Sequence, residues 1–287
     1  MNAYYGGNDP FADARSPVED PTVARDMHAT ISQAIQSATI ADAETDIVHL
    51  PVPAVINGTQ IRTAQVRELT GEDEEKLHRA MLSEEPERIL DTLLQCGVVK
   101  LGELTPNAAD LLDLAVASRD ELLLGIRRVT YGKEVKIEEL RCLHCGAKMY
   151  VSYDLDDVPR SAAANGLTDW RTTVKLRKGG TAVLRLPSGA DQLTILGEIR
   201  ERSINRAEQD TLLIARCLEN VTLPDGTIQP SGGITQAKAF GMADRAAIVK
   251  AMDENRPGPH LEDAKVTCPD CEKETGVPLS VDILFRG

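Results

Sequence analysis

Short apolar, β-branched runs flank a tight turn at two places along the chain. These runs and turns are residues 52–56, Asn57-Gly58 and 61–67, and then residues 173–176, Gly179-Gly180 and 182–186. Asn-Gly and Gly-Gly supply the positive backbone angles that two-residue hairpin turns need. The pattern therefore predicts one β-hairpin in each half of the chain. Gly179-Gly180 is interpreted as a turn and not as a phosphate loop, because no Gly-Lys-Ser/Thr follows it.

The same motif follows each predicted hairpin. Arg67-Glu-Leu-Thr-Gly-Glu-Asp73 matches Arg185-Leu-Pro-Ser-Gly-Ala-Asp191. A Thr or Ser followed three residues later by an acid is close to a capping box, in which side-chain oxygens satisfy the amide groups at a helix start. We expect a helix to begin directly after each hairpin. Because capping accounts for Asp73 and Asp191, we assign no catalytic carboxylate pair to them.

The likeness between the two halves continues in the same order. An apolar helix that ends at Cys96 corresponds to one that ends at Cys217, and a predicted helix at 119–128 corresponds to one at 244–252. Self-similarity at a period of about 120 residues indicates an internal repeat. The sequence therefore predicts an α+β fold, internally duplicated into two lobes. Each lobe would consist of a β-hairpin plus helices and a zinc knuckle.

The region before the first repeat has a different composition. Residues 1–46 are rich in Asp, Ala, Ser and Pro, and apolar residues share one face of a possible helix at 22–40. This N-terminal arm is either a flexible terminus or a segment that becomes ordered against a neighbouring subunit. The predicted domains are the arm at 1–46, a first repeat at 47–158 and a second repeat at 159–287.

Two Cys-x-x-Cys pairs carry the candidate chemistry. They are Cys142-Leu-His-Cys145 and Cys268-Pro-Asp-Cys271, and a β-like run follows each, at 148–153 and at 277–284. A thioredoxin-like redox pair lies at a helix start, whereas a pair between β-like runs is typical of a zinc knuckle. The pattern therefore predicts that Cys142, Cys145, Cys268 and Cys271 are the ligands of a structural Zn²⁺ ion.

The two pairs lie far apart in the sequence, so they can share one metal ion only if the two predicted repeats face each other. The predicted zinc ion would join the two half-sites within one chain; the alternative is that half-sites from two copies of the protein share the metal. Four thiolates saturate zinc and leave no position for a water molecule, so we expect no enzymatic activity. His144 and His260 lie near the pairs and are expected to be solvent-facing or to contact the ligands from outside.

Several other residues could have a functional role, but we expect their roles to be structural. Cys96 and Cys217 are expected to be small buried residues, because no histidine or acid partner repeats beside them. Arg127-Arg128 and the basic run at 175–178 are expected to be solvated surfaces, and Asp154-Leu-Asp-Asp157 is expected to be a turn. The sequence therefore offers no catalytic residue.

The composition of the chain limits the classes of molecule that it could bind. Acidic residues outnumber basic ones by 45 to 32, which gives a formal charge of −13, and aromatic residues make up only 3%. That balance repels a phosphate backbone and argues against nucleic-acid binding. The polar start resembles no signal peptide, and the uncharged run at 47–61 contains prolines, so we expect no membrane segment.

The order of motifs resembles a known family. Arg-x-Leu-Thr-Gly-x-Asp at 67–73, Glu121-Leu-Leu-Leu-Gly-Ile-Arg127, Tyr131-Gly132 and the two Cys-x-x-Cys pairs resemble the baseplate hub and tail-assembly proteins of contractile-tailed phages, the T-even type. Related proteins occur in phage-like contractile injection systems. The resemblance covers about residues 50–287 and includes all four cysteines of the predicted zinc site.

The resemblance implies a structural or assembly component of a tail baseplate that binds other tail proteins and no small-molecule substrate. Such a protein is made in the host cytoplasm and, if it stays in the particle, lies in the virion tail. The alternative function is a zinc-ribbon regulator that contacts nucleic acid or the transcription machinery. The charge of −13 counts against that alternative.

Overall fold

The first predicted hairpin is present as strands β1 (Thr45–Ile56) and β2 (Thr59–Arg67), joined by Asn57 and Gly58. Both turn residues have positive φ, 51° and 77°, as the predicted two-residue turn requires. The structure is a computed structural model that describes residues 44–83, 85, 88–162 and 170–285. The predicted arm up to residue 43, including the helix at 22–40, lies outside the described residues.

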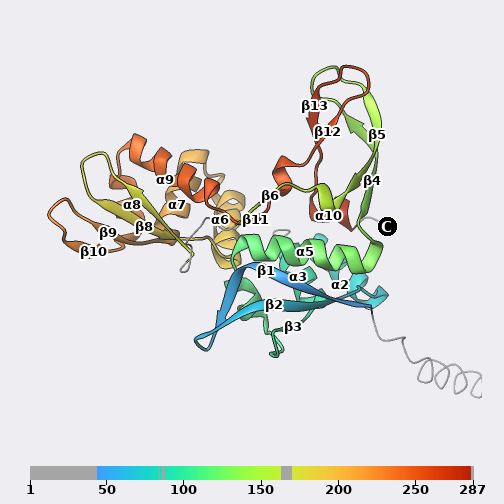
Figure 1. Cartoon of the computed structure of the whole chain (residues 1–287), viewed down its shortest axis with the longest axis horizontal. Helices are drawn as coiled ribbons and strands as arrows, with labels where there is room; N and C mark the ends of the chain where they lie inside the picture. The colour runs from blue at the N-terminus through green and yellow to red at the C-terminus, as the bar shows by residue number, and fades with distance from the viewer. Residues whose placement is uncertain (1–43, 84, 86–87, 163–169, 286–287) are drawn as a thin grey trace, which may run out of the picture. The chain divides into compact units, whose positions relative to one another are not determined.

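A third strand, β3 (Val98–Leu101), pairs antiparallel with β2 and completes a sheet of order β1-β2-β3. Four helices accompany this sheet: α2 (Gly71–Met81), α3 (Ile89–Gly97), α4 (Ala108–Asp113) and α5 (Val116–Tyr131). Helix α5 lies across β1 and β2 (Figure 1). Its Gly125 permits a close approach, because a Cβ at that position would lie 2.4 Å from Val48 Cγ2.

The second predicted hairpin is also present, as β7 (Arg171–Lys175) and β8 (Thr181–Arg185). They form a sheet of order β10-β9-β8-β7 with β9 (Leu218–Thr222) and β10 (Ile228–Pro230). The helices of this half are α6 (Gly189–Arg202), α7 (Arg206–Cys217), α8 (Gly233–Ala239) and α9 (Met242–Glu254). The helices and sheets together confirm the mixed α+β class.

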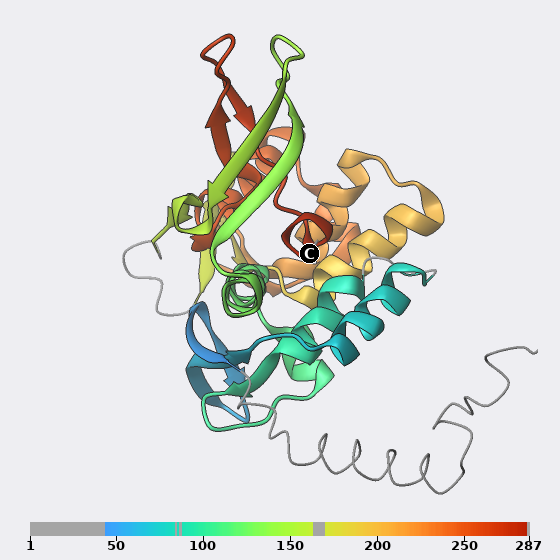
Figure 2. The same ribbon diagram turned by 90° about the vertical axis from the view of Figure 1, so that its right-hand side faces the viewer.

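Two further hairpins carry the cysteine pairs. The first consists of β4 (Glu134–Arg141) and β5 (Lys148–Asp154), and the second of β12 (Lys265–Thr267) and β13 (Glu274–Gly276). They lie side by side in both ribbon views, with their turns at the same end (Figures 1 and 2). The sequence DLDD at 154–157 forms a turn, as expected, that includes the 3₁₀ helix η3 (Leu155–Asp157).

Short elements complete the fold at the ends of these hairpins. Strand β6 (Arg160–Ser161) pairs antiparallel with β11 (Gly258–Pro259), which the 3₁₀ helix η4 (Leu261–Asp263) follows. The predicted β-like run at 277–284 is wrong. The strand ends at Gly276, Pro278 cannot donate a ladder hydrogen bond, and helix α10 (Val281–Leu284) follows. A helix places Leu284 in the interior, where its side chain is fully buried.

The hydrophobic interior divides in a way that the chain order does not suggest. The core around α5 includes Ala264, Val277, Leu279 and Leu284 from the far end of the chain. A separate core lies among the second sheet and its helices, and the fully buried Ile214 is part of it. Apolar residues from 264 to 284 therefore pack with the first half of the chain.

A small contact zone joins the two halves. Val52, Ala117 and Leu186 form a third apolar cluster there. The Val116 amide donates to the Pro187 carbonyl at 3.0 Å, and the Gly189 amide donates to the Leu114 carbonyl, also at 3.0 Å. The predicted boundary between residues 158 and 159 stays a prediction.

Candidate metal centre

The structure brings the four cysteines of the two distant pairs together within one chain. Cys142 Sγ lies 3.7 Å from Cys271 Sγ, and Cys145 Sγ lies 3.7 Å from Cys268 Sγ. All four sulfur atoms lie within 4.8 Å of one another. In a tetrahedral zinc site with Zn–S bonds of about 2.3 Å, neighbouring sulfur atoms are about 3.8 Å apart. The observed spacing fits that geometry.

The same distances exclude disulfides between these pairs. A disulfide needs an S–S separation of about 2.05 Å, and all four thiols are free. Cys142 and Cys268 are buried, Cys271 is half-buried and Cys145 is exposed, so the cluster lies at the surface with one side facing solvent.

The backbone of the two hairpin turns is alike. In the first turn the Cys142 amide donates to the Ala147 carbonyl and the Gly146 amide donates to the Cys142 carbonyl, both at 2.9 Å. In the second turn the Cys268 amide donates to the Lys273 carbonyl and the Glu272 amide to the Cys268 carbonyl, again at 2.9 Å.

The residue after each second cysteine has positive φ, 74° at Gly146 and 57° at Glu272. Glycine adopts this conformation at little cost, whereas a glutamate there is strained by roughly 1 kcal/mol or more. The second turn keeps the conformation in spite of that cost. Both turns therefore present their two sulfur atoms in the same way.

Backbone amides act on the sulfur atoms directly. The His144 amide donates to Cys142 Sγ at 3.4 Å. Hydrogen bonds from the Cys145 and His144 amides lower the pKa of Cys142 to about 6. The Ala147 amide acts to lower the pKa of Cys145, but burial and the three neighbouring thiols raise it to about 12. A thiol with a raised pKa, such as Cys145, keeps its proton at neutral pH. A divalent cation that binds the sulfur atom would displace that proton.

Two hydrogen bonds tie the hairpins together beside the sulfur atoms. The Leu143 amide donates to Oγ1 of the buried Thr275 at 3.1 Å. His144 Nε2 lies 3.0 Å from the Glu274 carbonyl oxygen, and the ring is exposed. His144 is therefore not one of the clustered donors. It contacts the second turn from outside, as expected.

His260 lies away from the cluster. Its Nε2 lies 2.9 Å from Ser161 Oγ, and its Nδ1 lies 2.8 Å from an Arg256 nitrogen. Glu262 and Asp263 bring carboxylates near this ring. Arg256 also forms an ion pair with Glu262. The expectation that His260 faces solvent or contacts the ligands is wrong: its side chain is largely buried and joins β6 to the segment after β11.

The two capping aspartates have a second role that the sequence did not reveal. Asp73 accepts two hydrogen bonds from Arg67, at 2.8 and 3.1 Å, and Asp191 accepts two from Arg185, at 2.5 and 3.0 Å. Each aspartate also accepts from the amide and the hydroxyl of its Thr70 or Ser188 cap. The arginines already stood in both matched motifs, six residues earlier, which was the available signal.

The other two cysteines lie on helices α3 and α7. Cys217 is fully buried, as predicted, and Cys96 is only half-buried. Burial raises the pKa of Cys96 to about 11 and that of Cys217 to about 12. Both thiols are therefore protonated at neutral pH and poorly reactive.

The expectation for Arg127 is wrong. Its side chain is only 6% exposed, and it donates to the carbonyls of Gly132 and Glu134 at 2.7 and 2.9 Å. The guanidinium therefore fixes the chain directly after α5, at the C-cap residue Gly132 and at Glu134, the first residue of β4. Lys175, Arg177 and Lys178 are exposed, as expected.

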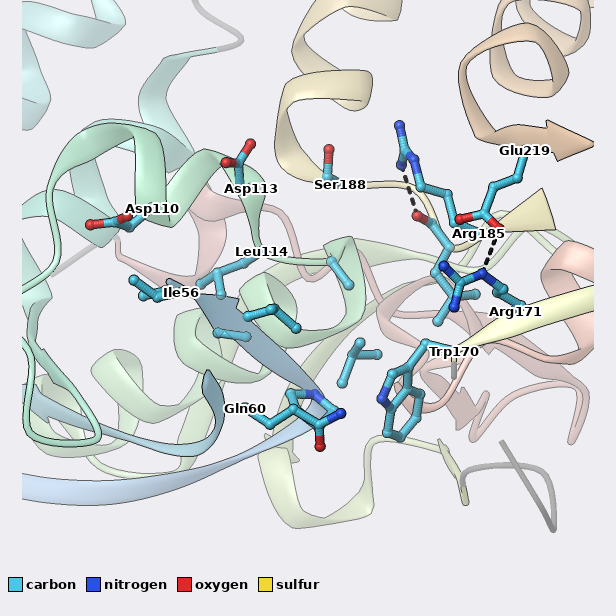
Figure 3. A pocket seen from close by; sticks show the side chains of 16 residues that line it. Ile56, Gln60, Asp110, Asp113, Leu114, Trp170, Arg171, Arg185, Ser188 and Glu219 are labelled. Atoms are coloured by element: carbon cyan, nitrogen blue, oxygen red, sulfur yellow. Dashed lines mark hydrogen bonds and ion pairs between the residues drawn. The ribbon is translucent and has the colours of Figure 1, made fainter. Parts of the chain in front are cut away.

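A pocket of about 520 Å³ lies between β1 and the start of the second sheet (Figure 3). Trp170, the only tryptophan of the chain, forms part of its wall with Val52 and Leu186. The basic lining groups point to acids: Arg171 pairs with Glu219, and Arg185 pairs with Asp191. Ser188 also lines the pocket, and its hydroxyl donates to Asp191, the capping carboxylate that Arg185 already holds, so its Oγ belongs to the helix cap.

The sequence model of a family described as T4 bacteriophage base plate protein matches residues 54–284. The matched region includes both pairs of cysteines. No curated protein and no solved structure matches the chain. In the described part of the chain, no helix is long and apolar enough to cross a bilayer.

Proposed function

This chain belongs to the T4 bacteriophage base plate protein family, and from that premise we propose that it is a structural or assembly component of a contractile phage tail baseplate, held together by a four-cysteine zinc site. The observation that carries the proposal is the cluster of Cys142, Cys145, Cys268 and Cys271 inside a chain that matches this family over most of its length. Its role would be mechanical and not enzymatic.

The zinc assignment rests on the chemistry of the donors. Four thiols at tetrahedral spacing, on two turns with amides directed at sulfur, suit a soft divalent cation. Zinc in such a site supplies a cross-link and no open coordination position. In this chain the cross-link would join the β4–β5 hairpin to the β12–β13 hairpin, more than a hundred residues later in the sequence.

Internal duplication is the second part of the proposal. The pairs Arg67–Asp73 and Arg185–Asp191 have the same bidentate geometry beside the same capping box. The ladder from the second to the third strand is irregular at equivalent places in both halves, after Gln65 and after Val183.

The matching cysteine turns add to these similarities. A duplicated gene segment explains all of them together, and it explains why each half supplies half of the cysteine cluster. The proposed repeats are residues 47–158 and 159–287.

The partners of such a component would be other tail proteins, met in the host cytoplasm during assembly and, for a part that stays in the particle, in the virion tail. The test is assembly in a phage deleted for this gene, with the full chain supplied from a plasmid. We expect baseplates and infectious particles only when the chain is present. Complete, functional tails without it would contradict the proposed function.

A further inference from the structure

A second, smaller pocket of about 390 Å³ lies among α2, the start of α3, the end of α5 and α10. Its walls are mostly apolar: Leu69, Leu77, Met81, Ile89, Tyr131 and Phe285. Polar groups lie at the rim, namely Glu74, His78 and Asp282, and all three residues are exposed. The pocket can hold a large apolar side chain, because its walls offer apolar contact on several sides.

The aromatic wall of this pocket is held in place. Tyr131 meets Phe285 edge to face, with the ring centroids 6.3 Å apart. The guanidinium of Arg127 lies 5.0 Å from the centroid of the Tyr131 ring. Because Arg127 is itself fixed by two backbone carbonyls, the Tyr131 ring is braced against collapse into the space.

Leu69, another wall residue, is fixed in a similar way. The Leu69 amide donates to Thr130 Oγ1 at 3.2 Å, which ties the start of α2 to the end of α5. A pocket with preformed walls costs little reorganisation when a ligand enters.

Two of the apolar lining residues are exposed, Met81 at 39% and Tyr131 at 47%. Leu82, the residue after Met81, is 84% exposed. Single exposed apolar residues are normal, but several around one concave site are typical of a protein–protein contact.

The charge at the rim specifies the partner. Glu72 and Glu75 on α2 pair with Lys76 and Arg79. Glu74 and Asp282 have no ion-pair partner among the described residues, and both line the pocket. An unbalanced acidic rim beside an apolar pocket is complementary to a basic residue next to an apolar one.

We propose that this pocket binds a segment of another tail protein, which inserts a large aliphatic or aromatic side chain and places a lysine or arginine against Glu74 and Asp282. The proposal rests on the proposed function, since it names one of the surfaces by which the chain would join the baseplate. It is independent of the cysteine cluster, which none of the pocket residues contributes to.

Photocrosslinking tests the occupant. The probe is p-benzoylphenylalanine at Met81 in the full chain, expressed while tails assemble. The control is the same probe at Met242, a methionine on α9 that is 89% exposed. After irradiation, mass spectrometry of the adduct identifies the crosslinked peptide. We expect an adduct from Met81 to a tail protein at an apolar residue flanked by Lys or Arg, at a yield at least about tenfold above Met242.

Four outcomes would overturn the proposal. They are equal yields at the two positions, an adduct to a second copy of the chain, an adduct to residues 1–43 of the chain itself, or an adduct to a segment without a basic residue. If the chain still enters tails in such a case, only the pocket proposal fails. A chain that never associates with tail proteins overturns the proposed function as well.

Charge reversal gives the independent measurement. In the variant Glu74→Lys/Asp282→Lys both changed side chains are exposed, so the fold and its circular dichroism should not change. We expect the amount of chain that sediments with tail intermediates to fall at least about tenfold. The matched control is Asp253→Lys/Glu254→Lys, two exposed acids on α9 that do not line the pocket, which should sediment like the unchanged chain. Equal sedimentation of the charge-reversed variant and the control would overturn the proposal.

Discussion

Asp73 lies in the first turn of α2, directly after the first hairpin, and its carboxylate accepts hydrogen bonds from three kinds of donor. They are the Arg67 guanidinium, the Thr70 amide and the Thr70 hydroxyl. The carboxylate is almost fully buried, so the charge is stable there only because these donors replace water. Burial acts to raise the pKa of Asp73, but the hydrogen bonds from Arg67 and Thr70 lower it to about 2.

Because its pKa is lower in the folded chain, ionised Asp73 stabilises the fold at pH above its ordinary value near 4. That contribution is lost as the pH falls from about 4 toward 2. We expect Asp73→Asn to lower the free energy of unfolding at pH 7 by roughly 1–3 kcal/mol. Urea unfolding of both chains should show the difference shrinking below pH 4. A constant difference between pH 7 and pH 3 would contradict this account, and Asp253→Asn is the exposed control.

Two glycines in helices give a matched pair at the same scale. A Cβ at Gly125 of α5 would lie 2.4 Å from Val48 Cγ2, whereas nothing lies within 4 Å of a Cβ at Gly197 of α6. We expect Gly125→Ala to destabilise the chain by about 1–3 kcal/mol through overpacking against β1. Gly197→Ala should stabilise it by up to about 1 kcal/mol through helix propensity. Thermal unfolding measures both, and equal shifts of the same sign would contradict the packing of α5 on β1.

At the scale of elements, local signals explain what could be predicted. Asn57-Gly58 and Gly179-Gly180 specify hairpin turns by their backbone angles, and a hydroxyl three residues before an acid specifies a helix start. The two Cys-x-x-Cys turns were likewise visible, because short spacing alone brings two sulfur atoms together. Each of these features depends on a few neighbouring residues.

The predictions that are wrong concern residues whose conformation depends on contacts beyond their immediate neighbours. The run at 277–284 is apolar enough for a strand, but its side chains enter the core around α5 and the last four residues form α10. Arg127 was expected to be a surface charge. The turn of the chain after α5 brings the carbonyls of Gly132 and Glu134 within hydrogen-bonding distance of its guanidinium. No local pattern contains that information.

The proposed zinc link between the two cysteine hairpins predicts how fast the backbone amides of these hairpins exchange with solvent. If zinc holds β4–β5 to β12–β13, Cys145→Ser should lower the zinc content and speed amide hydrogen exchange at 134–154 and 265–276. Exchange in β1, β2 and β3 should change much less, because their core does not depend on the cluster's exposed ligand. Cys96→Ser, outside the cluster, is the matched control. Unchanged exchange in both hairpins would contradict a role for the metal in joining them.

For the whole molecule, a metal ion held by the four cysteines would close a very long loop of chain. Residues between Cys145 and Cys268 include the entire second sheet and its helices. Closing so long a loop reduces the entropy of the unfolded chain, and the stabilisation grows slowly with loop length. The core adds a second closure, because α10 packs with the first half.

The measurement that tests the central claim most directly is native mass spectrometry of the freshly purified full chain, which gives metal content and oligomeric state together. The account predicts one zinc ion for each single chain, and loss of that ion in Cys268→Ser. A folded chain without zinc, or one zinc shared by two chains, would contradict it.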